Sequence, residues 1–358
     1  MNACSPRVSI CIPNLNMRPF LAERMQSLLS QTFSDWELIV CDSYSTDGSW
    51  EFLQSYRGDP RIRLFQVPRE GVFAGWNECL RRVRGEFIWI ATSDDTADPA
   101  FLEQLLAPLE QLPEVDIAVC DFQAIDARSI PVDLGIGRQK RIFFAEYLNA
   151  HGIWDGKAQF LLHLAFGTTW TTMAAVLFRR RLLDGVGLFR TDMEGMGDYD
   201  WSLRASLLSS SAYVPRKLVT WRIHDGQCTG LRPMTIGESR AIMRSIQLIC
   251  NESRHGFPEE WKQVPNWQEL LLSKALWDYY GAYQLYRGVL KTNVRAFVGR
   301  VFLALCNEPS LLLRQCANAF KWSEQFSPDP IAAADRLLTA FKPQWPPRIV
   351  PPGLWKCP

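Results

Sequence analysis

The chain has 358 residues, of which 47% are hydrophobic and 22% are charged, and its 39 Lys and Arg residues nearly balance 38 Asp and Glu residues. This composition is that of an ordinary globular protein and excludes a disordered chain. The formal net charge of +1 gives no global reason to expect a nucleic-acid partner.

Short apolar runs alternate with segments of helical periodicity in the first third of the chain. Strands are expected at residues 8–12, 37–41, 62–67, 87–91 and 117–122. Helices are expected at residues 20–31, 49–56, 72–83 and 100–112. This alternation predicts an α/β fold with a mainly parallel sheet flanked by helices on both faces. Ligands of such sheets bind beyond the carboxyl ends of the strands.

The pattern becomes irregular between residues 126 and 171, and then predicts a strand at 173–178 and a helix at 199–209. From about residue 233 helical periodicity dominates, and a proline-rich tail at 343–358 is expected to be irregular. We therefore expect a domain over residues 1–232, with halves 1–126 and 127–232. A mostly helical C-terminal subdomain is expected over residues 233–358.

The ten cysteines include no CxxC pair and no group with zinc-ligand spacing. Cys11, Cys41 and Cys120 lie in apolar runs typical of buried strands, which predicts a reducing compartment. The polar residues 1–7 lead directly into a strand pattern, so no signal peptide is expected. Because no apolar run is long enough to span a bilayer, we predict a cytoplasmic protein.

Carboxylates lie at the ends of three of the predicted strands, at Asp42, at Asp94 with Asp95, and at Asp121. Carboxylates are costly to bring together unless a cation neutralises them, and a divalent metal bound to phosphate does so. Asp94 and Asp95 could place one carboxylate on a metal and the other on a ribose hydroxyl. The alternative is that Ser93 and these two residues only cap the following helix.

Several short motifs follow one another in residues 9–95. They are Ile12-Pro13-Asn14-Leu15-Asn16, Leu28-Leu29-Ser30-Gln31-Thr32, Trp36-Glu37-Leu38-Ile39-Val40-Cys41-Asp42, Ser45-Thr46-Asp47-Gly48-Ser49, residues 71–77, residues 85–90 and Ser93-Asp94-Asp95. In this order and spacing they resemble the nucleotide-binding half of the family 2 glycosyltransferases. The resemblance implies a GT-A fold, which is Rossmann-like. Residues 1–126 would bind a nucleotide sugar, and residues 127–232 would supply the acceptor site and the catalytic base.

The resemblance also implies roles for individual residues. Asp42 would accept a hydrogen bond from the nucleotide base, as a carboxylate beside a uracil imide would; its alternative role is to form a turn. A divalent metal, Mn²⁺ or Mg²⁺, would stabilise the leaving nucleoside diphosphate. The expected contacts of the nucleotide sugar are Pro13, Asn14, Asn16, Asp42, Asn77, Ser93 and Asp94. The expected metal ligands are Asp94, Asp95 and His224.

Asp198 begins a second motif, residues 198–204, which resembles the family's Glu-Asp motif. An inverting transfer needs a base on the face opposite the departing diphosphate, to take the proton of the acceptor hydroxyl. Asp198 occupies the position of that base, and its anion would be favoured at the start of the predicted helix. The alternatives are that Asp198 is only a helix cap, or that Asp200 is the base.

His224 lies in a further motif, residues 221–224, which resembles the family's Arg-x-His element. A neutral imidazole there could complete the metal shell, or Arg222 could contact phosphate, although a lone His is more often structural. Thr171 and Thr172 could face the acceptor.

Four positions depart from the family's pattern, and one of them is Leu15, where an aromatic residue is usual. Thr92 stands where a further Asp is usual, Trp76 where Arg is usual, and Gly197 where Glu is common. These departures motivate the alternative of a protein that binds sugar nucleotides without turning them over.

Aromatic residues accompany basic ones in the C-terminal region, namely Trp277, Tyr279, Tyr280, Tyr283 and Tyr286 near Arg287 and Lys291. They could lie against the inner face of a membrane as a peripheral association, but a helical subdomain packed on the core is the preferred interpretation.

Together these features predict an inverting glycosyltransferase. It would move a hexose or aminosugar from a nucleoside-diphosphate donor, UDP foremost, to a glycan or lipid-linked glycan acceptor, with no nucleic-acid partner. A dinucleotide-dependent oxidoreductase is rejected, because residues 13–16 do not form the glycine fingerprint that binds a dinucleotide.

Overall fold

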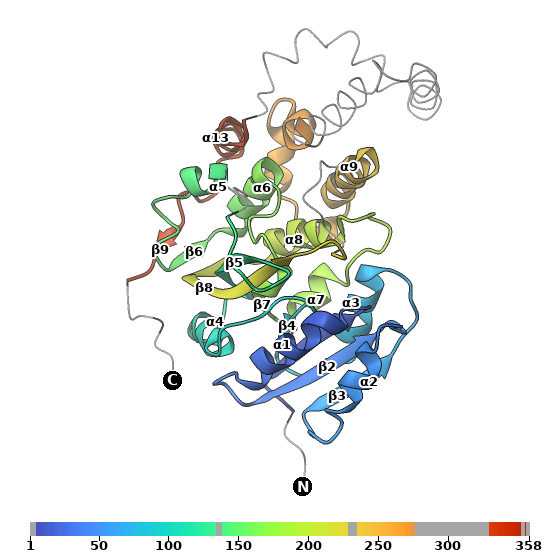
Figure 1. Cartoon of the computed structure of the whole chain (residues 1–358). Helices are drawn as coiled ribbons and strands as arrows, with labels where there is room; N and C mark the ends of the chain where they lie inside the picture. The colour runs from blue at the N-terminus through green and yellow to red at the C-terminus, as the bar shows by residue number, and fades with distance from the viewer. Residues whose placement is uncertain are drawn as a thin grey trace, which may run out of the picture.

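A nine-stranded sheet lies at the centre of the computed structural model, which describes residues 5–133, 138–227, 235–273, 275, 329–351 and 355 (Figure 1). Its strands are β1 (Val8–Asn14), β2 (Trp36–Asp42), β3 (Ile62–Gln66), β4 (Phe87–Ile90), β5 (Ile117–Asp126), β6 (Gly152–Trp154), β7 (Val176–Arg179), β8 (Ser211–Ile223) and β9 (Arg348–Ile349). They are ordered β3-β2-β1-β4-β7-β5-β8-β6-β9. Only β7 and β6 run against the others in this sheet, so the predicted α/β fold with a mainly parallel sheet is confirmed.

Helices cover both faces of the sheet. They are α1 (Arg18–Leu29), α2 (Ser49–Gln54), α3 (Val72–Leu80), α4 (Phe101–Gln111), α5 (Arg138–Phe143), α6 (Gly156–Phe166), α7 (Leu182–Val186), α8 (Gly197–Leu208), α9 (Ile236–Asn251) and α13 (Pro330–Phe341). One face packs against α1, α2 and α4, and the other packs against α3, α7 and α8. Helices α6, α9 and α13 form a further layer around α8 (Figure 1).

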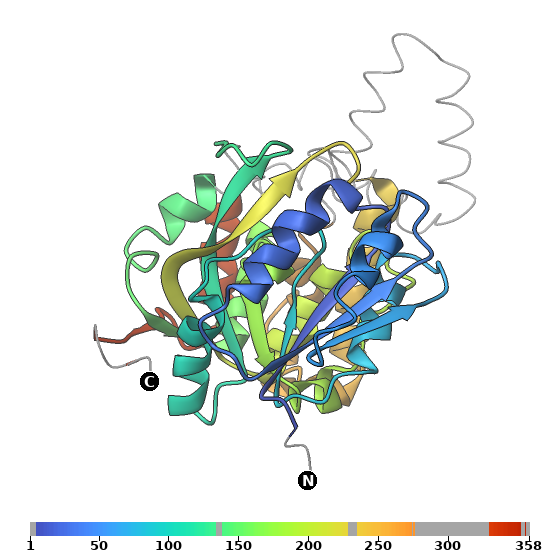
Figure 2. The same cartoon turned by 60° about the horizontal axis from the view of Figure 1, so that its bottom comes forward.

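The alternation of side chains along the strands explains this layering. Val8, Ile10 and Ile12 of β1 share a core with α1, whereas Cys11 shares one with α3 and α8. Because successive side chains of a strand point to opposite faces, a run that is apolar throughout is buried on both. Helix α1 crosses the front of the strands in Figure 2. Each fully buried aliphatic side chain in these layers stabilises the fold by about 1.5–3 kcal/mol.

Side-chain caps begin the helices that shape the site. The Asp47 carboxylate accepts a hydrogen bond from the Arg18 amide at the start of α1, at 2.8 Å. The Asp155 carboxylate accepts one from the Ala158 amide in α6, at 2.9 Å. Thr235 and Glu238 form a reciprocal capping box at the start of α9. Each such cap satisfies amides that have no partner within the helix.

Several sheet elements differ from the sequence-based expectation. β7 enters antiparallel between β4 and β5, and β6 and β8 were not expected as strands. The described part of the tail is irregular as expected, except at β9, which pairs with β6. The aromatic residues 277–286 and the basic residues 287 and 291 lie outside the described residues. None of the helices that the structure describes is long and apolar enough to cross a membrane.

Candidate functional site

A hollow of about 540 Å³, here called the first hollow, opens beyond the carboxyl ends of β1 and β4. Its wall includes Pro13 and Asn14 from the end of β1, and Ser93, Asp94 and Asp95 from the loop after β4. Asp198, from the first turn of α8, lines the same hollow. Six of the predicted site residues therefore converge, although they come from three separate stretches of the chain. A pocket of this size with a few charged groups is typical of a small-molecule site.

Asp95 is held by the protein through both carboxylate oxygens. Its Oδ1 accepts a hydrogen bond from the Arg222 amide at 2.8 Å, and its Oδ2 accepts one from the Thr92 hydroxyl at 2.7 Å. Burial and then the neighbouring Asp94 charge raise the pKa of Asp95 to about 7. Thr92 thus supplies a donor to Asp95, where the family usually has another carboxylate.

Arg222 fastens the acidic loop to β8. Its guanidinium is 1% exposed and donates to the Asp94 carbonyl oxygen at 2.6 Å and to the Glu23 carboxylate at 2.6 Å. The same group also reaches the Asp126 carbonyl oxygen and the Ser129 hydroxyl. Arg222, the arginine of the Arg-x-His element, therefore supports the loop that carries Asp94.

His224 approaches Asp94 from the end of β8. The His224 Nε2 atom lies 3.1 Å from the Asp94 Oδ2 atom, and the imidazole is largely buried against the Phe20 ring. Within the described ranges, no group of three or more His, Cys, Asp or Glu side chains could hold a metal by itself. An oxygen and a nitrogen donor that face one another nevertheless suit Mn²⁺ or Mg²⁺ when diphosphate oxygens complete the shell. The donor set therefore fits a metal that binds together with a ligand.

Arg24 lies beneath the acidic loop and was not singled out from the sequence. It is fully buried, its Nε donates to the carbonyl oxygens of Ala91 and Thr92, and its guanidinium stacks over the Trp89 ring. Burial lowers the pKa of Arg24, and the negative charges of Asp95 and Asp94 oppose that effect, so the pKa falls to about 10. The signal in the sequence was an arginine on the apolar stripe of α1, between Leu21 and Leu28.

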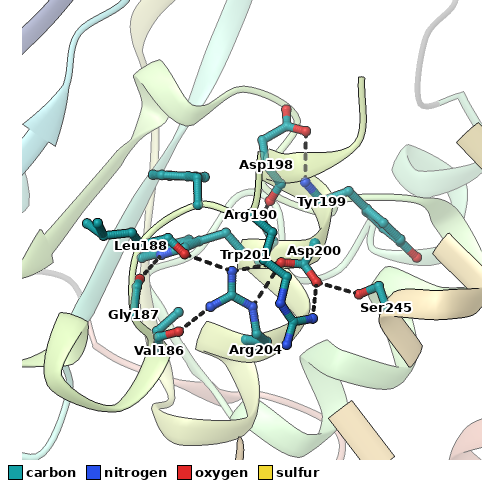
Figure 3. A network of polar contacts seen from close by, with 12 residues as sticks. Val186, Gly187, Leu188, Arg190, Asp198, Tyr199, Asp200, Trp201, Arg204 and Ser245 are labelled. Atoms are coloured by element: carbon teal, nitrogen blue, oxygen red, sulfur yellow. Dashed lines mark hydrogen bonds and ion pairs between the residues drawn. The ribbon is translucent and has the colours of Figure 1, made fainter. Parts of the chain in front are cut away.

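Asp198 projects from the start of α8 into the hollow. Its Oδ1 accepts a hydrogen bond from the Tyr199 amide at 2.8 Å, and the structure gives it no cationic partner among the described residues. Figure 3 shows its carboxylate directed away from Asp200. Asp200 instead binds Arg190, Arg204 and Ser245. Burial raises the pKa of Asp198 to about 6.

Four of the predicted residues do not line the first hollow. Asp42 lies behind its wall, where its carboxylate accepts hydrogen bonds from Asn14 Nδ2 at 2.7 Å and from the Ser45 hydroxyl at 2.6 Å. Asn16 bridges to Ser45 and Thr46. The Asn77 side chain binds the backbone of Phe189 through both its oxygen and its nitrogen. His224 does not line the hollow itself, but it is hydrogen-bonded to Asp94, Gly226 and Gln227, which do.

Other residues line the hollow without having been assigned to it. The exposed Arg69, which precedes α3, brings a cation to the hollow, and Trp221 of β8 also lines it. Thr171 and Thr172, expected to face the acceptor, also line it. Arg69 lies in a loop with no periodicity, so its position depends on the path of the backbone after β3.

Comparisons with known proteins bear on the family and the fold of the chain. The model of the family described as Glycosyl transferase family 2 matches residues 9–163. An uncharacterized protein of Mycobacterium tuberculosis is 30% identical over 218 residues, which are 61% of this chain and 67% of that protein. An uncharacterized glycosyltransferase of Rickettsia typhi is 27% identical over 242 residues, which are 67% of this chain and 71% of that protein. The chain spans between 39% and 67% of the length of four curated relatives that it matches.

Solved structures share the fold at low sequence identity. TarS from S. aureus in complex with UDP-GlcNAc gives a TM-score of 0.58 at 16% identity, over 77% of this chain and 73% of that one. The mannosyltransferase PcManGT from Pyrobaculum calidifontis, in complex with GDP-Man and Mn²⁺, gives 0.54 at 17% identity, over 93% and 87%. The chain therefore belongs to the family 2 glycosyltransferases and has the GT-A fold.

Proposed function

We propose that this protein transfers a sugar from a nucleoside-diphosphate donor to a hydroxyl group of a glycan or lipid-linked glycan, with inversion at the anomeric carbon. The observation that carries the proposal is the shared hollow, in which Asp94 and Asp95 line one part of the wall and Asp198 another. A single site can then bind an activated sugar at one end and deprotonate its attacker at the other.

Asp198 is the proposed general base. As the acceptor oxygen forms its bond to the anomeric carbon, the bond from that carbon to the diphosphate oxygen breaks, and the hydroxyl proton passes to the Asp198 carboxylate. With its pKa raised to about 6 by burial, Asp198 is ionised near neutral pH and is a stronger base than an exposed carboxylate. The absence of a cationic partner for Asp198 among the described residues leaves the carboxylate available to the acceptor.

The nucleotide is proposed to lie along the end of β1. Asp42 and Ser45 hold the nitrogen of the Asn14 side chain, and the Asn14 oxygen is buried and accepts no hydrogen bond from the described residues. An unpaired buried acceptor is suited to the imide N–H of uracil. TarS has been solved with UDP-GlcNAc, which also supports a UDP-linked donor as the first candidate.

Asp94 and His224 are the side chains that would hold a divalent metal. A bound Mn²⁺ or Mg²⁺ would supply positive charge for the diphosphate as it leaves. The Asp94 Oδ2 and His224 Nε2 atoms are close enough to be joint ligands, while both oxygens of Asp95 are bound within the protein. PcManGT was solved with Mn²⁺, which supports the same cation here. Asp95 is then proposed to position the loop or to contact the ribose.

The test is transfer by an Asp198→Asn variant, using the sugar nucleotide selected by a thermal-shift screen with Mn²⁺. We expect kcat to fall by about 10²- to 10⁴-fold, because the variant cannot take the acceptor proton. Donor affinity should stay within about twofold of the parent value, because the base acts only as the transition state forms.

Asp192→Asn is the matched control, since the Asp192 carboxylate is exposed and pairs with Arg244 away from the lining of the first hollow. Near-normal turnover by Asp198→Asn would refute the assignment of the base. Donor binding by the parent protein without any turnover would instead support the alternative of a sugar-nucleotide-binding protein.

A further inference from the structure

A second hollow of about 220 Å³ adjoins the first one on the far side of Asp198. The two hollows share Thr171, Gly195, Asp198 and Trp221 as lining residues, so they meet where the proposed base lies. The rest of the second hollow lies between α6, α8 and α9, away from the loop that carries Asp94. It is smaller than a drug-sized ligand site and has room for about one ring with a short substituent.

Aliphatic side chains form most of its wall. Leu164 comes from α6, Ile242 and Ile246 from α9, and Leu271 and Ala275 from the segment that follows. All five are buried in the core cluster around α8. Asp198 is the one charged side chain among the described residues that line this hollow.

The polar groups of the second hollow are few and partly occupied. The Tyr199 hydroxyl donates to the His163 carbonyl oxygen at 2.8 Å, and the Thr168 carbonyl oxygen accepts a hydrogen bond from Lys140. Among the described side chains, the hydroxyl groups of Thr168 and Thr171, the Asp198 carboxylate and the Trp221 indole are the polar groups that the wall offers to a ligand. A sugar with hydroxyl groups on every side would leave several of them buried and unpaired, which weakens binding.

The backbone at the junction of the two hollows is strained. Thr171 has φ of 51°, in the left-handed region that β-branched residues rarely adopt. The Thr172 amide donates a hydrogen bond to the Trp170 carbonyl oxygen, which closes a tight three-residue turn with Thr171 at its centre. Such a conformation persists only where the surrounding structure enforces it, and strained residues cluster at functional sites.

The position of the second hollow gives it a role, provided that the proposed function holds. An inverting attack brings the acceptor to the side of the anomeric carbon opposite the diphosphate, with its hydroxyl at the base. We propose that the second hollow receives the part of the acceptor that carries the attacking hydroxyl, and that this part has an apolar edge, as in a deoxysugar ring. The aliphatic side chains of α9 pack against the apolar edge of the acceptor, and the Asp198 carboxylate accepts a hydrogen bond from its attacking hydroxyl.

The experiment compares matched acceptors that differ by one oxygen atom, such as methyl glycosides of a 6-deoxyhexose and of the parent hexose. The donor is the nucleotide sugar that the screen selects. We expect KM to be roughly tenfold lower for the better deoxy acceptor than for its hydroxylated partner, because the latter buries an unpaired hydroxyl. Equal KM values, or a preference for the hydroxylated members, would overturn the proposal.

Ile246→Thr tests whether the aliphatic wall causes the preference. The change makes the wall polar, and Ile246→Val is its matched control because Val and Thr have nearly the same shape. We expect the ratio of KM values to shrink at least threefold in Ile246→Thr and to persist in Ile246→Val. A ratio that responds equally to both variants would overturn the role of this wall.

Two further readouts separate this inference from the proposed function. Donor hydrolysis without acceptor requires the first hollow and Asp198 but no sugar in the second hollow. If the parent protein neither hydrolyses nor transfers the donor, that result counts against the proposed function. The thermal shift caused by each acceptor pair needs no turnover. An equal shift by both members of every pair would overturn the acceptor proposal, even if the donor is hydrolysed normally.

Discussion

The Asp198 carboxyl group combines two properties that matter for its chemistry. It lines the meeting point of two hollows, and its raised pKa comes from burial and not from a neighbouring anion. An ordinary Asp titrates near pH 4, so a group that titrates near pH 6 leaves a distinct mark on the rate.

The rate of transfer should therefore depend on pH between about 5 and 7. Because the base must be ionised, kcat/KM should fall about tenfold for each pH unit below the pKa of about 6 and should level off above it. The measurement is kcat/KM for the acceptor from about pH 4.5 to 8, at saturating donor and metal. An inflection near pH 4 would mean that Asp198 is solvated in the working enzyme, and would contradict the role of burial.

The acidic loop shows how departures from the family's pattern fit together. With Thr92 in place of a carboxylate, the loop offers Asp95 a hydroxyl donor at 2.7 Å and avoids a third buried negative charge. Arg24 binds the carbonyl oxygens of Ala91 and Thr92, and Arg222 binds the carbonyl oxygen of Asp94. Like charges held together in a buried site raise one another's pKa, so these three residues limit that cost.

At the scale of elements, the start of α8 depends on how closely α3 approaches it. A β-carbon added to Gly197 would lie 2.6 Å from the Phe73 ring, which is far inside contact distance. That ring stacks on Phe189 and meets Trp76 edge-on, so it has little room to move. The absence of the family's common Glu before Asp198 is therefore linked to Phe73, which occupies the space of its side chain.

This packing predicts a reversal of sign in a double-mutant cycle. Gly197→Ala alone should lower the free energy of unfolding by about 1–3 kcal/mol, because it forces the ring and the helix apart. In a Phe73→Ala background the same change should be neutral or stabilising by up to about 1 kcal/mol, because Ala favours a helix more than Gly does. Urea unfolding of the four proteins measures the coupling. Additive effects would show that ring and helix do not compete for this space.

At the scale of the whole molecule, the sequence was most informative where local pattern decides structure. The five strands that alternate with helices α1–α4 have apolar runs bounded by turn residues, and they lie where the pattern placed them. β8 escaped notice because Pro215, Arg216 and Lys217 interrupt its apolar alternation where the strand is least buried. β7 was expected as a strand, but its direction depends on the path of the chain between β5 and β8.

The same distinction between local pattern and long-range contacts applies to the site. Short-range motifs were enough to predict that Asn14, Asp94 and Asp198 share one hollow. Residues at the carboxyl ends of neighbouring strands and at helix starts lie at one edge of the sheet. Motifs could not tell that Asp42 is bound within the wall or that Asn77 clamps the backbone of Phe189. Those outcomes depend on which hydrogen-bonding groups lie within reach of each side chain in the folded protein, and these groups come from distant segments of the chain.

The network around Asp200 ties α8, the helix that carries Asp198, to the rest of the molecule. Asp200 is 1% exposed and binds Arg204 at 2.7 Å, Arg190 at 2.9 Å and the Ser245 hydroxyl of α9 at 2.7 Å (Figure 3). Arg204 in turn donates to the carbonyl oxygens of Val186 and Leu188. Loop, α8 and α9 thus meet at one carboxylate beneath Asp198, and α9 also forms the aliphatic wall of the second hollow.

Removing the charge of Asp200 should loosen this junction more than removing its neighbour's hydroxyl. Asp200→Asn leaves Arg204 buried without its counter-ion and should lower the free energy of unfolding by about 3 kcal/mol. Ser245→Ala removes one hydrogen bond to the same carboxylate and should cost about 1 kcal/mol. Urea unfolding checks both values, and equal losses in the two variants would contradict a central role for the Asp200 charge. Because α9 carries the aliphatic wall, Asp200→Asn should also weaken acceptor preference more than donor affinity.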